Sequence, residues 1–394
     1  MLLPPIGCKQ CGLFLFNCTK TQSHYCSRCN ETLFIPVPQI RNKLIAISLT
    51  GFILLLTSFT LPFLSLYFNS FSHSIYLTDI ILGLWQAGYK SIALLFCFTV
   101  IILPSLFYLA CIGLCFAPKK YAIDLIKFVE KSTDWLLIDV LIVSILVSYT
   151  KMGAFGDLYF HPGFFTLFLS STCLIYLQHL KQVHSLWFLL PTKNQQLRQP
   201  LHLCPICHHL NRDKQCKQCC HQIEPPQKKN QLHQCWAYLI TAMILYIPAN
   251  SLPMMITSQF GQDSGDTILS GIILLWNMHA YGIAIIIFIA SIFIPLFKMV
   301  MLAWLYLTAG KGSAKQQSFW FKVTHVIGKW SFIDIFVIAI LTALIQFGEV
   351  IHIAPGSASI AFTGVVIFTL LSAHQFNSAL FFKLDSAIQP NDAF

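Results

Sequence analysis

The chain has 394 residues, of which 56% are hydrophobic and 10% charged, and its formal net charge is +10. Soluble domains carry about 25% charged residues, so this composition excludes an ordinary soluble globule and predicts a polytopic membrane protein. The positive charge then indicates membrane orientation rather than nucleic-acid binding, because 22 of the 25 Lys and Arg fall on one side of the topology argued below.

Residues 1–36 form a cysteine module. Cys8 and Cys11 make one C-x2-C pair, and Cys26 and Cys29 make a second. Two such pairs facing each other bring four thiolates to one tetrahedral ion, and zinc fits that donor set better than iron. Because protein fills all four positions, the site is expected to stabilise the fold rather than to catalyse a reaction. Redox-active pairs are the alternative, but they normally open a helix after a strand.

The same module recurs in residues 191–230. Its predicted ligands are Cys204, Cys207, Cys216 and Cys219, with Cys220 as an alternative to Cys219. Two zinc-ribbon modules of this kind predict two structural zinc ions per chain.

The apolar sequence repeats together with the cysteine modules. Pro62 recurs as Pro253, Trp85 as Trp276 and Pro104 as Pro295, each 191 residues later, Trp135-x3-Asp139 recurs as Trp330-x3-Asp334, and Pro162-Gly163 recurs as Pro355-Gly356. We therefore expect two tandem copies in the same orientation, with membrane modules at 37–190 and 231–394.

Eight apolar segments predict eight transmembrane helices, four in each half. They cover residues 44–66, 91–117, 135–150, 163–180, 235–256, 282–309, 330–347 and 360–382. Short interfacial helices are expected at 78–89 and 265–281, with Trp85 and Trp276 at headgroup level, although one long tilted helix is an alternative. The predicted fold class is an all-α polytopic membrane protein built from two repeats.

Positive residues are distributed unevenly among the connecting segments. The N-terminal tail holds five Lys and Arg, the C-terminal tail one, and segments 118–134, 181–234 and 310–329 hold four, eight and four, whereas the opposite loops hold Lys151. This asymmetry predicts that both termini and both cysteine modules are cytoplasmic, where thiols stay reduced.

Lys298 is predicted to lie in the middle of the sixth transmembrane helix. A charge at that depth costs at least ~2.5 kcal/mol, so the side chain should face a bundle interior or a wet cavity. Ser291 lies on the same face, and Pro295 between them frees a backbone carbonyl. Together they predict a polar stripe inside the membrane.

Further polar residues are expected to line the same cavity. Asp334 is the expected counter-charge of Lys298, although Ser331-x2-Asp334 also matches a helix capping box. Thr369 and Asn250 are embedded in apolar spans, and Asp139 is the first-half equivalent of Asp334. Under the repeat alignment Ser291, Lys298, Asn250 and Thr369 stand opposite Val100, Phe107, Phe59 and Tyr176. The second half is therefore predicted to carry the working cavity and the first half to be chiefly scaffold.

The doubled architecture resembles a known family. The residues that carry the resemblance are the cysteine modules, Ile247-Pro248-Ala249-Asn250-Ser251-Leu252-Pro253, Pro295-x2-Lys298 and Phe332-Ile333-Asp334-Ile335-Phe336. They are similar to the paraquat-inducible protein A family of bacterial inner-membrane proteins. The resemblance implies a partner with mammalian-cell-entry (MCE) domains that forms a periplasmic tunnel for phospholipids. The first half lacks the Pro-Ala-Asn run and the lysine.

Two functions remain open at this point. The first is a non-enzymatic inner-membrane subunit that passes phospholipid between the membrane and the MCE-domain partner. The second is a self-sufficient secondary transporter with Lys298 and Asp334 as an ion or proton relay. Parallel repeats favour the first, because transporters built for alternating access usually have inverted ones. The sequence contains no P-loop for ATP.

Overall fold

The computed structural model describes much of the chain between residues 6 and 376. Outside the described residues lie 1–5, 9–13, 16–18, 20–21, 28–29, 31, 69–70, 153–156, 184–185, 191–201, 205, 208–209, 212–214, 223–227, 260–261, 278, 280, 309–313, 345, 348–350 and 377–394.

The long helices of the two halves follow the same order. In the first half they are α1 (Ile40–Thr60), α3 (Lys90–Phe96) continued by η1 (Cys97–Ile102) and α4 (Leu103–Phe116), α6 (Ile138–Met152) and α7 (Pro162–Val183). In the second half they are α8 (Lys228–Ser251), α10 (Tyr281–Phe288) continued by η4 (Ile289–Phe293) and α11 (Ile294–Thr308), α13 (Ile333–Leu344) and α14 (Ser357–Gln375).

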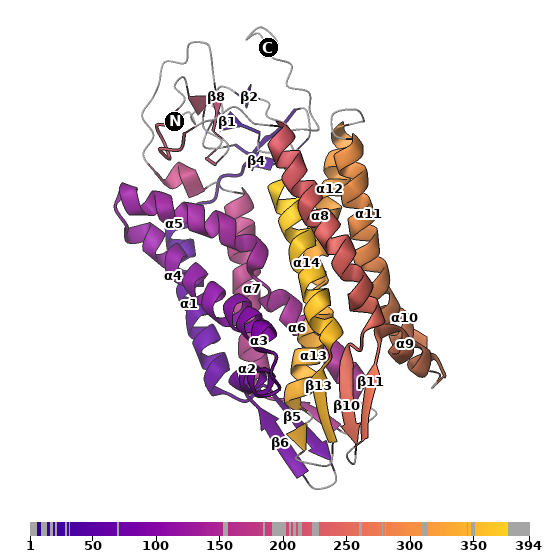
Figure 1. Cartoon of the computed structure of the whole chain (residues 1–394). Helices are drawn as coiled ribbons and strands as arrows, with labels where there is room; N and C mark the ends of the chain where they lie inside the picture. The colour runs from indigo at the N-terminus through magenta and orange to yellow at the C-terminus, as the bar shows by residue number, and fades with distance from the viewer. Residues whose placement is uncertain are drawn as a thin grey trace.

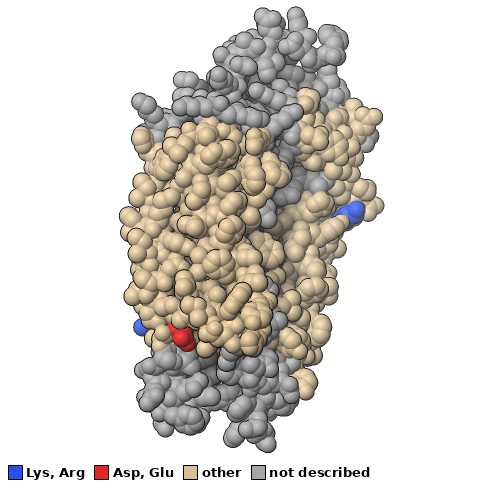
Figure 2. All heavy atoms as spheres, turned by 90° about the vertical axis from the view of Figure 1, so that its right-hand side faces the viewer, with Lys and Arg blue, Asp and Glu red and all other residues tan. Residues whose placement is uncertain are grey.

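Seven helices among the described residues are long and apolar enough to cross a membrane, so the chain is a multi-pass membrane protein. The seventh predicted helix, at 330–347, corresponds to α13, which has only 12 described residues. The face in Figure 2, which includes second-half helices, has few charged side chains between its two grey ends. Such a surface suits contact with lipid.

Two segments predicted as connecting loops are helical. Residues 118–134 contain α5 (Lys119–Ser132) and η2 (Thr133–Trp135), and residues 310–329 lie largely in α12 (Ala314–Trp330). In α5 the buried residues Ala122, Ile126 and Val129 recur every three or four positions, which forms one apolar face. The charge count used these segments only to predict a membrane side and did not consider their amphipathic pattern.

Equivalent helices pack in equivalent ways. The first and fourth helices of each half lie side by side, α1 with α7 and α8 with α14, and the third helices α6 and α13 join the two halves (Figure 1). At this junction the Ser144 hydroxyl donates a hydrogen bond to the Ile333 carbonyl over 3.2 Å. Lys329 likewise donates to the Thr133 carbonyl over 2.9 Å.

The short helices before the second transmembrane helix are present, as α2 (Leu77–Gln86) and α9 (Ile268–Asn277). Each is separated from the next helix by a residue with positive φ, Gly88 at 88° and His279 at 60°. These two positions are 191 residues apart, so the interruption itself belongs to the repeat. The halves differ in packing, because α2 lies against α13 whereas α9 mainly contacts α10.

The prediction of an all-α fold was incomplete, because each half also carries a small antiparallel sheet. In the first half the order is β6 (Phe71–Ile75), β5 (Leu64–Phe68), β7 (Asp157–Phe160). In the second it is β11 (Gln262–Asp266), β10 (Met255–Gln259), β13 (Ile351–Pro355), β12 (Gln346–Phe347). Both sheets lie at the end of the molecule opposite β4 (Thr32–Phe34) and β8 (His202–Leu203) (Figure 1). Three strands overlap the ends of predicted transmembrane helices, β5 that at 44–66, β10 that at 235–256 and β12 that at 330–347. The other strands lie outside the predicted transmembrane helices.

The repeated proline and glycine residues meet beside these sheets. The amide of Gly163 donates to the Pro62 carbonyl over 3.1 Å, and that of Ala358 donates to the Pro253 carbonyl over 3.1 Å. A Cβ added at Gly356 would lie 2.0 Å from the Pro253 carbonyl oxygen, and one at Gly163 would lie 2.5 Å from the Pro62 oxygen. Only glycine permits so close a backbone approach.

Gly356→Ala is therefore expected to destabilise the protein by about 3 kcal/mol or more, because backbone atoms must move apart. The measurement is the thermal unfolding temperature in detergent, together with abundance in membranes. Gly282→Ala is the matched control, because an added Cβ there meets nothing within 4 Å. Equal unfolding temperatures for the two variants would contradict this account of the repeated Pro and Gly.

Candidate metal centre and buried polar site

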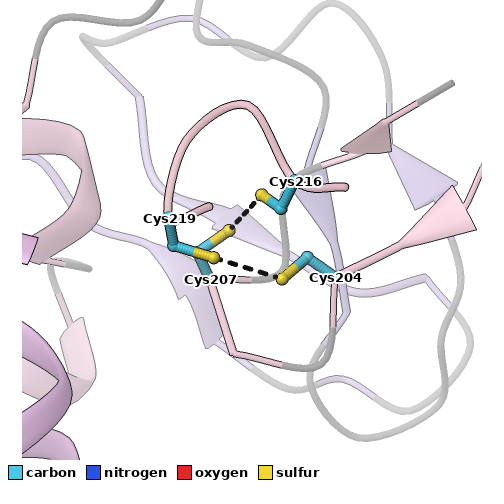
Figure 3. A group of neighbouring side chains, drawn as sticks. All are labelled: Cys204, Cys207, Cys216 and Cys219. Atoms are coloured by element: carbon cyan, nitrogen blue, oxygen red, sulfur yellow. Dashed lines mark hydrogen bonds between the residues drawn. The ribbon is translucent and has the colours of Figure 1, made fainter. Parts of the chain in front are cut away.

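The second cysteine module gathers its four predicted ligands at one point. The module contains the pair β8 (His202–Leu203) and β9 (Leu210–Asn211), and Cys204, Cys207, Cys216 and Cys219 are all buried. Their sulfur atoms lie within 4.8 Å of one another and face the centre of the group (Figure 3). Across the knuckles, Sγ of Cys204 lies 3.5 Å from that of Cys219, and Sγ of Cys207 lies 3.4 Å from that of Cys216.

This donor set fits a zinc ion. Zinc–sulfur bonds of about 2.3 Å in a tetrahedron place sulfurs about 3.8 Å apart, close to the spacing observed. Cys219 rather than Cys220 belongs to the group, because Cys220 is exposed and has a left-handed backbone. Hydrogen bonding to Cys207 lowers the pKa of Cys204 to about 7, whereas the same contact raises the pKa of Cys207. A buried cluster that already favours some thiolates is suited to a cation.

Asn211 supports this cluster and was missed by the sequence analysis. Its side chain is fully buried, and its Nδ2 donates to Sγ of Cys216 over 3.3 Å. Its Oδ1 accepts the amide hydrogen of Lys217 over 3.0 Å. Such contacts orient a ligand sulfur. The only signal in the sequence is one asparagine between the two knuckles, which is too common a feature to single out.

The first module is only partly described. Its strand pairs are β1 (Ile6–Gly7) with β2 (Phe14–Leu15) and β3 (His24–Tyr25) with β4 (Thr32–Phe34). Cys8 and Cys26 are buried, while the other two predicted ligands, Cys11 and Cys29, lie outside the described residues. Cys8 and Cys26 share one buried apolar cluster with residues of α8, α11 and α14. The N-terminal module therefore packs on the second membrane half.

Lys298 is buried within the second membrane half, with only 1% of its surface exposed. Its Nζ donates to Oγ1 of Thr369 on α14 over 2.9 Å, and Thr369 in turn donates to the Val366 carbonyl over 3.0 Å. Gly328 of α12 leaves room for the ammonium, because a Cβ there would lie 2.9 Å from Nζ. An ammonium group has three N–H donors, and Thr369 accepts the one hydrogen bond found within the described part of the chain.

Ser291 and Asn250 lie on neighbouring helices of the same half. Ser291 is buried in the π-helical segment η4, which precedes Pro295. Asn250 is half-buried near the end of α8, and its Nδ2 donates to the Tyr246 carbonyl over 2.9 Å. Tyr246 donates its own hydroxyl to the Ile292 carbonyl over 3.2 Å. Sequence reasoning missed this tyrosine, because an aromatic residue in an apolar span is indistinguishable from packing.

The expected ion pair between Lys298 and Asp334 is not formed: within the described residues, no ion pair joins them. Lys298 extends toward Gly328 and Thr369, whereas Asp334 lies half-buried in the first turn of α13. The alternative capping box lacks its serine contact, because the buried Ser331 hydroxyl has no hydrogen-bond partner in the described structure. Asp139 occupies the equivalent first turn of α6. There it interacts electrostatically with Lys329, which comes from the other half.

Comparison with known proteins identifies a family whose model matches both membrane halves. The family model described as "Paraquat-inducible protein A" matches residues 42–190 and 232–384, one membrane half each. The intermembrane transport protein PqiA of Escherichia coli K12 is 30% identical over 400 residues, covering 95% of this chain and 94% of that protein. A probable intermembrane transport protein of Haemophilus influenzae is 30% identical over 91% of this chain and 90% of its own length.

A third relative carries a different name. The lipophilic envelope-spanning tunnel protein A of Escherichia coli K12 is 26% identical over 390 residues, covering 95% of this chain and 90% of that protein. No solved structure matches the chain. Because the family model covers most of both membrane halves, the chain belongs to the paraquat-inducible protein A family.

Proposed function

We propose that the chain is the inner-membrane subunit of an intermembrane phospholipid transport system, and that it is not an enzyme. It passes phospholipids between the membrane and a periplasmic MCE-domain partner through a polar cavity in the second membrane half. The names of its relatives, two of which are intermembrane transport proteins, support this role. The observation that carries the site is Lys298, a buried cation among membrane-spanning helices with Thr369 as its described partner.

The chemistry of Lys298 suits a phospholipid headgroup. A lysine ammonium acts as a compact point charge for phosphate, and it is costly to bury unless a ligand or polar group compensates it. Ser291 and Thr369 supply hydroxyl groups from η4 and α14. Asn250 lies further along α8 than Tyr238, the residue that stacks on Phe368 beside Thr369. Asp334 and Asp139 enter the two third helices at the junction between the halves, and we assign them to the edge of this cavity.

The alternative, a self-sufficient secondary transporter with a Lys298/Asp334 relay, receives less support. A direct relay needs the two side chains in hydrogen-bond contact, and the structure brings Lys298 to Thr369 instead. The two membrane halves also repeat in parallel, with their strands and helices in the same order.

We further propose that each cysteine module holds one structural zinc ion and that both modules and both termini are cytoplasmic. The described parts of the two cysteine modules lie at one end of the molecule in Figure 1, and the two sheets lie at the other. With this orientation the sheets face the periplasm, where the tunnel partner is expected. The excess of Lys and Arg on the opposite side supports the same assignment.

Single-cysteine labels test this orientation, in variants that keep the eight predicted zinc ligands and have every other native cysteine replaced. Positions 119 and 315 should react with an impermeant reagent only after the inner membrane is opened. Positions 72 and 260 should react in cells whose outer membrane alone is permeable. Reaction of position 119 from the periplasm would reverse the topology and place the cysteine modules on an oxidising side.

Co-purification tests the proposed function itself. The chain is extracted gently from native membranes, and bound proteins and lipids are identified by mass spectrometry. An MCE-domain protein and phospholipid are expected. A preparation with neither, or with a soluble solute that the chain transports alone, would contradict the proposal.

A further inference from the structure

Each half contains a π-helical segment before a proline, and one backbone carbonyl in each segment accepts a hydrogen bond from a side-chain hydroxyl. η1 and η4 each precede a proline, Pro104 and Pro295 respectively. A π turn and a proline both interrupt the regular hydrogen bonds of an α-helix, so nearby carbonyl groups need other donors inside a membrane. The carbonyls of Ile101 and Ile292, which are 191 residues apart, both accept a side-chain hydroxyl.

The halves supply that hydroxyl in different ways. In the first half Ser105 donates to the Ile101 carbonyl over 2.7 Å, from one turn later in the same helix. The residue equivalent to Ser105 is Leu296, which has no donor. In the second half the donor is instead Tyr246, which reaches the Ile292 carbonyl from α8 over 3.2 Å.

The hydrogen bond of Tyr246 joins two parts of the proposed site. α8 packs against α14, which carries Thr369, whereas η4 carries Ser291 and leads into α11 with Lys298. The Tyr246 carbonyl also accepts the amide of Asn250 over 2.9 Å, which ties the same residue to the end of α8. The first-half equivalent of Tyr246 is Leu55, which cannot form the link.

We propose that Tyr246 is a positioning residue that couples α8 to the π-helical segment η4 and so sets the place of Ser291 and Lys298 relative to Thr369. This inference rests on the proposed lipid-transfer function. In the first half the equivalent hydrogen bond lies within one helix, whereas the hydrogen bond of the Tyr246 hydroxyl joins two helices. The link exists only in the half that carries the buried lysine, whereas the first half satisfies its carbonyl locally and remains scaffold.

Tyr246→Phe tests the link, because it removes the hydroxyl and keeps the ring. We expect normal abundance in membranes and about a fivefold loss of phospholipid transferred per chain, the effect of losing one hydrogen bond. Ser105→Ala is the matched control, because it removes the donor to the equivalent carbonyl in the first half. Its transfer should remain normal, and an equal loss in that variant would overturn the proposal.

The double variant Tyr246→Phe with Leu296→Ser separates coupling from simple satisfaction of the carbonyl. It gives Ile292 the local donor used in the first half but does not restore the link to α8. Transfer should stay low, and recovery of transfer would show that the carbonyl needs only a donor. If Tyr246→Phe lowers abundance, the double variant should recover abundance without transfer, and failure to recover abundance would also overturn the proposal.

The role of Tyr246 and the proposed lipid-transfer function can be tested separately. Normal transfer by Tyr246→Phe, beside lost transfer by Lys298→Met, overturns the role of Tyr246 alone. Normal transfer by both variants overturns the proposed site.

Discussion

We expect Lys298→Met to abolish envelope-barrier function in a strain that lacks the native gene, while the protein stays folded and abundant. Methionine keeps most of the side-chain volume, and removing a buried charge does not by itself destabilise a membrane helix. Loss of a charged hydrogen bond to phosphate should weaken headgroup binding about 10- to 100-fold. The measurements are growth in the presence of a membrane-disrupting detergent and the amount of protein in the membrane. Lys298→Ala should give the same result.

The aspartates provide the comparison for this prediction. If Asp334 lines the cavity, Asp334→Ala should also lose function without loss of abundance, whereas Asp139→Ala should matter less because Phe107 stands at the lysine position of the first half. If the polar residues are structural instead, the single variants of Lys298 and Asp334 should both lose abundance. Replacing both by apolar residues should then restore abundance. Normal barrier function in Lys298→Met would remove Lys298 from the site.

Cys204→Ser should lower the abundance of the protein severely and reduce its zinc content from two ions to one per chain. Closed zinc sites contribute folding free energy directly, and serine is a poor ligand for zinc. The measurements are elemental analysis of the purified protein and its amount in membranes. Because the second module is buried against the rest of the protein, loss of its ion should be felt beyond the module.

Cys220→Ser is the matched control, because Cys220 is adjacent to the cluster but exposed and outside it. It should keep both ions and normal abundance. A Cys204→Ser protein that is abundant and contains two zinc ions would refute the metal site. An abundant but inactive Cys204→Ser protein would favour redox chemistry at these cysteines.

The features that depend on spacing along the chain could be predicted from the sequence. Periodic or repeated residues predict the repeat and the second cysteine cluster. They also predict the helices before and after the interruption at Gly88. The buried position of Lys298 followed from the cost of a charge in an apolar segment. In the sequence, Pro253 and Gly356 could each be recognised only as a repeated residue. The structure shows that their backbones are in contact.

The features that depend on three-dimensional direction could not be predicted in the same way. Adjacent helices suggested that Lys298 meets Asp334, but a side chain reaches the space that small neighbours leave, and Gly328 leaves that space on α12. The hydroxyl of Tyr246 reaches the Ile292 carbonyl in the π-helical segment η4 from another helix, a contact that no residue pattern in the sequence predicts. The sheets were missed because strands this short have no hydropathy signal of their own, and three of them overlap the ends of apolar segments that predict helices.

Transfer of a labelled phospholipid tests whether the chain delivers lipid to its partner and whether Lys298 is needed for the delivery. Proteoliposomes that contain the chain and the labelled lipid are mixed with the purified MCE-domain partner, and lipid bound to the partner is counted. We expect that the native chain loads the partner and that Lys298→Met, reconstituted in equal amount, does not. Equal loading by Lys298→Met, or by liposomes without the chain, would contradict it.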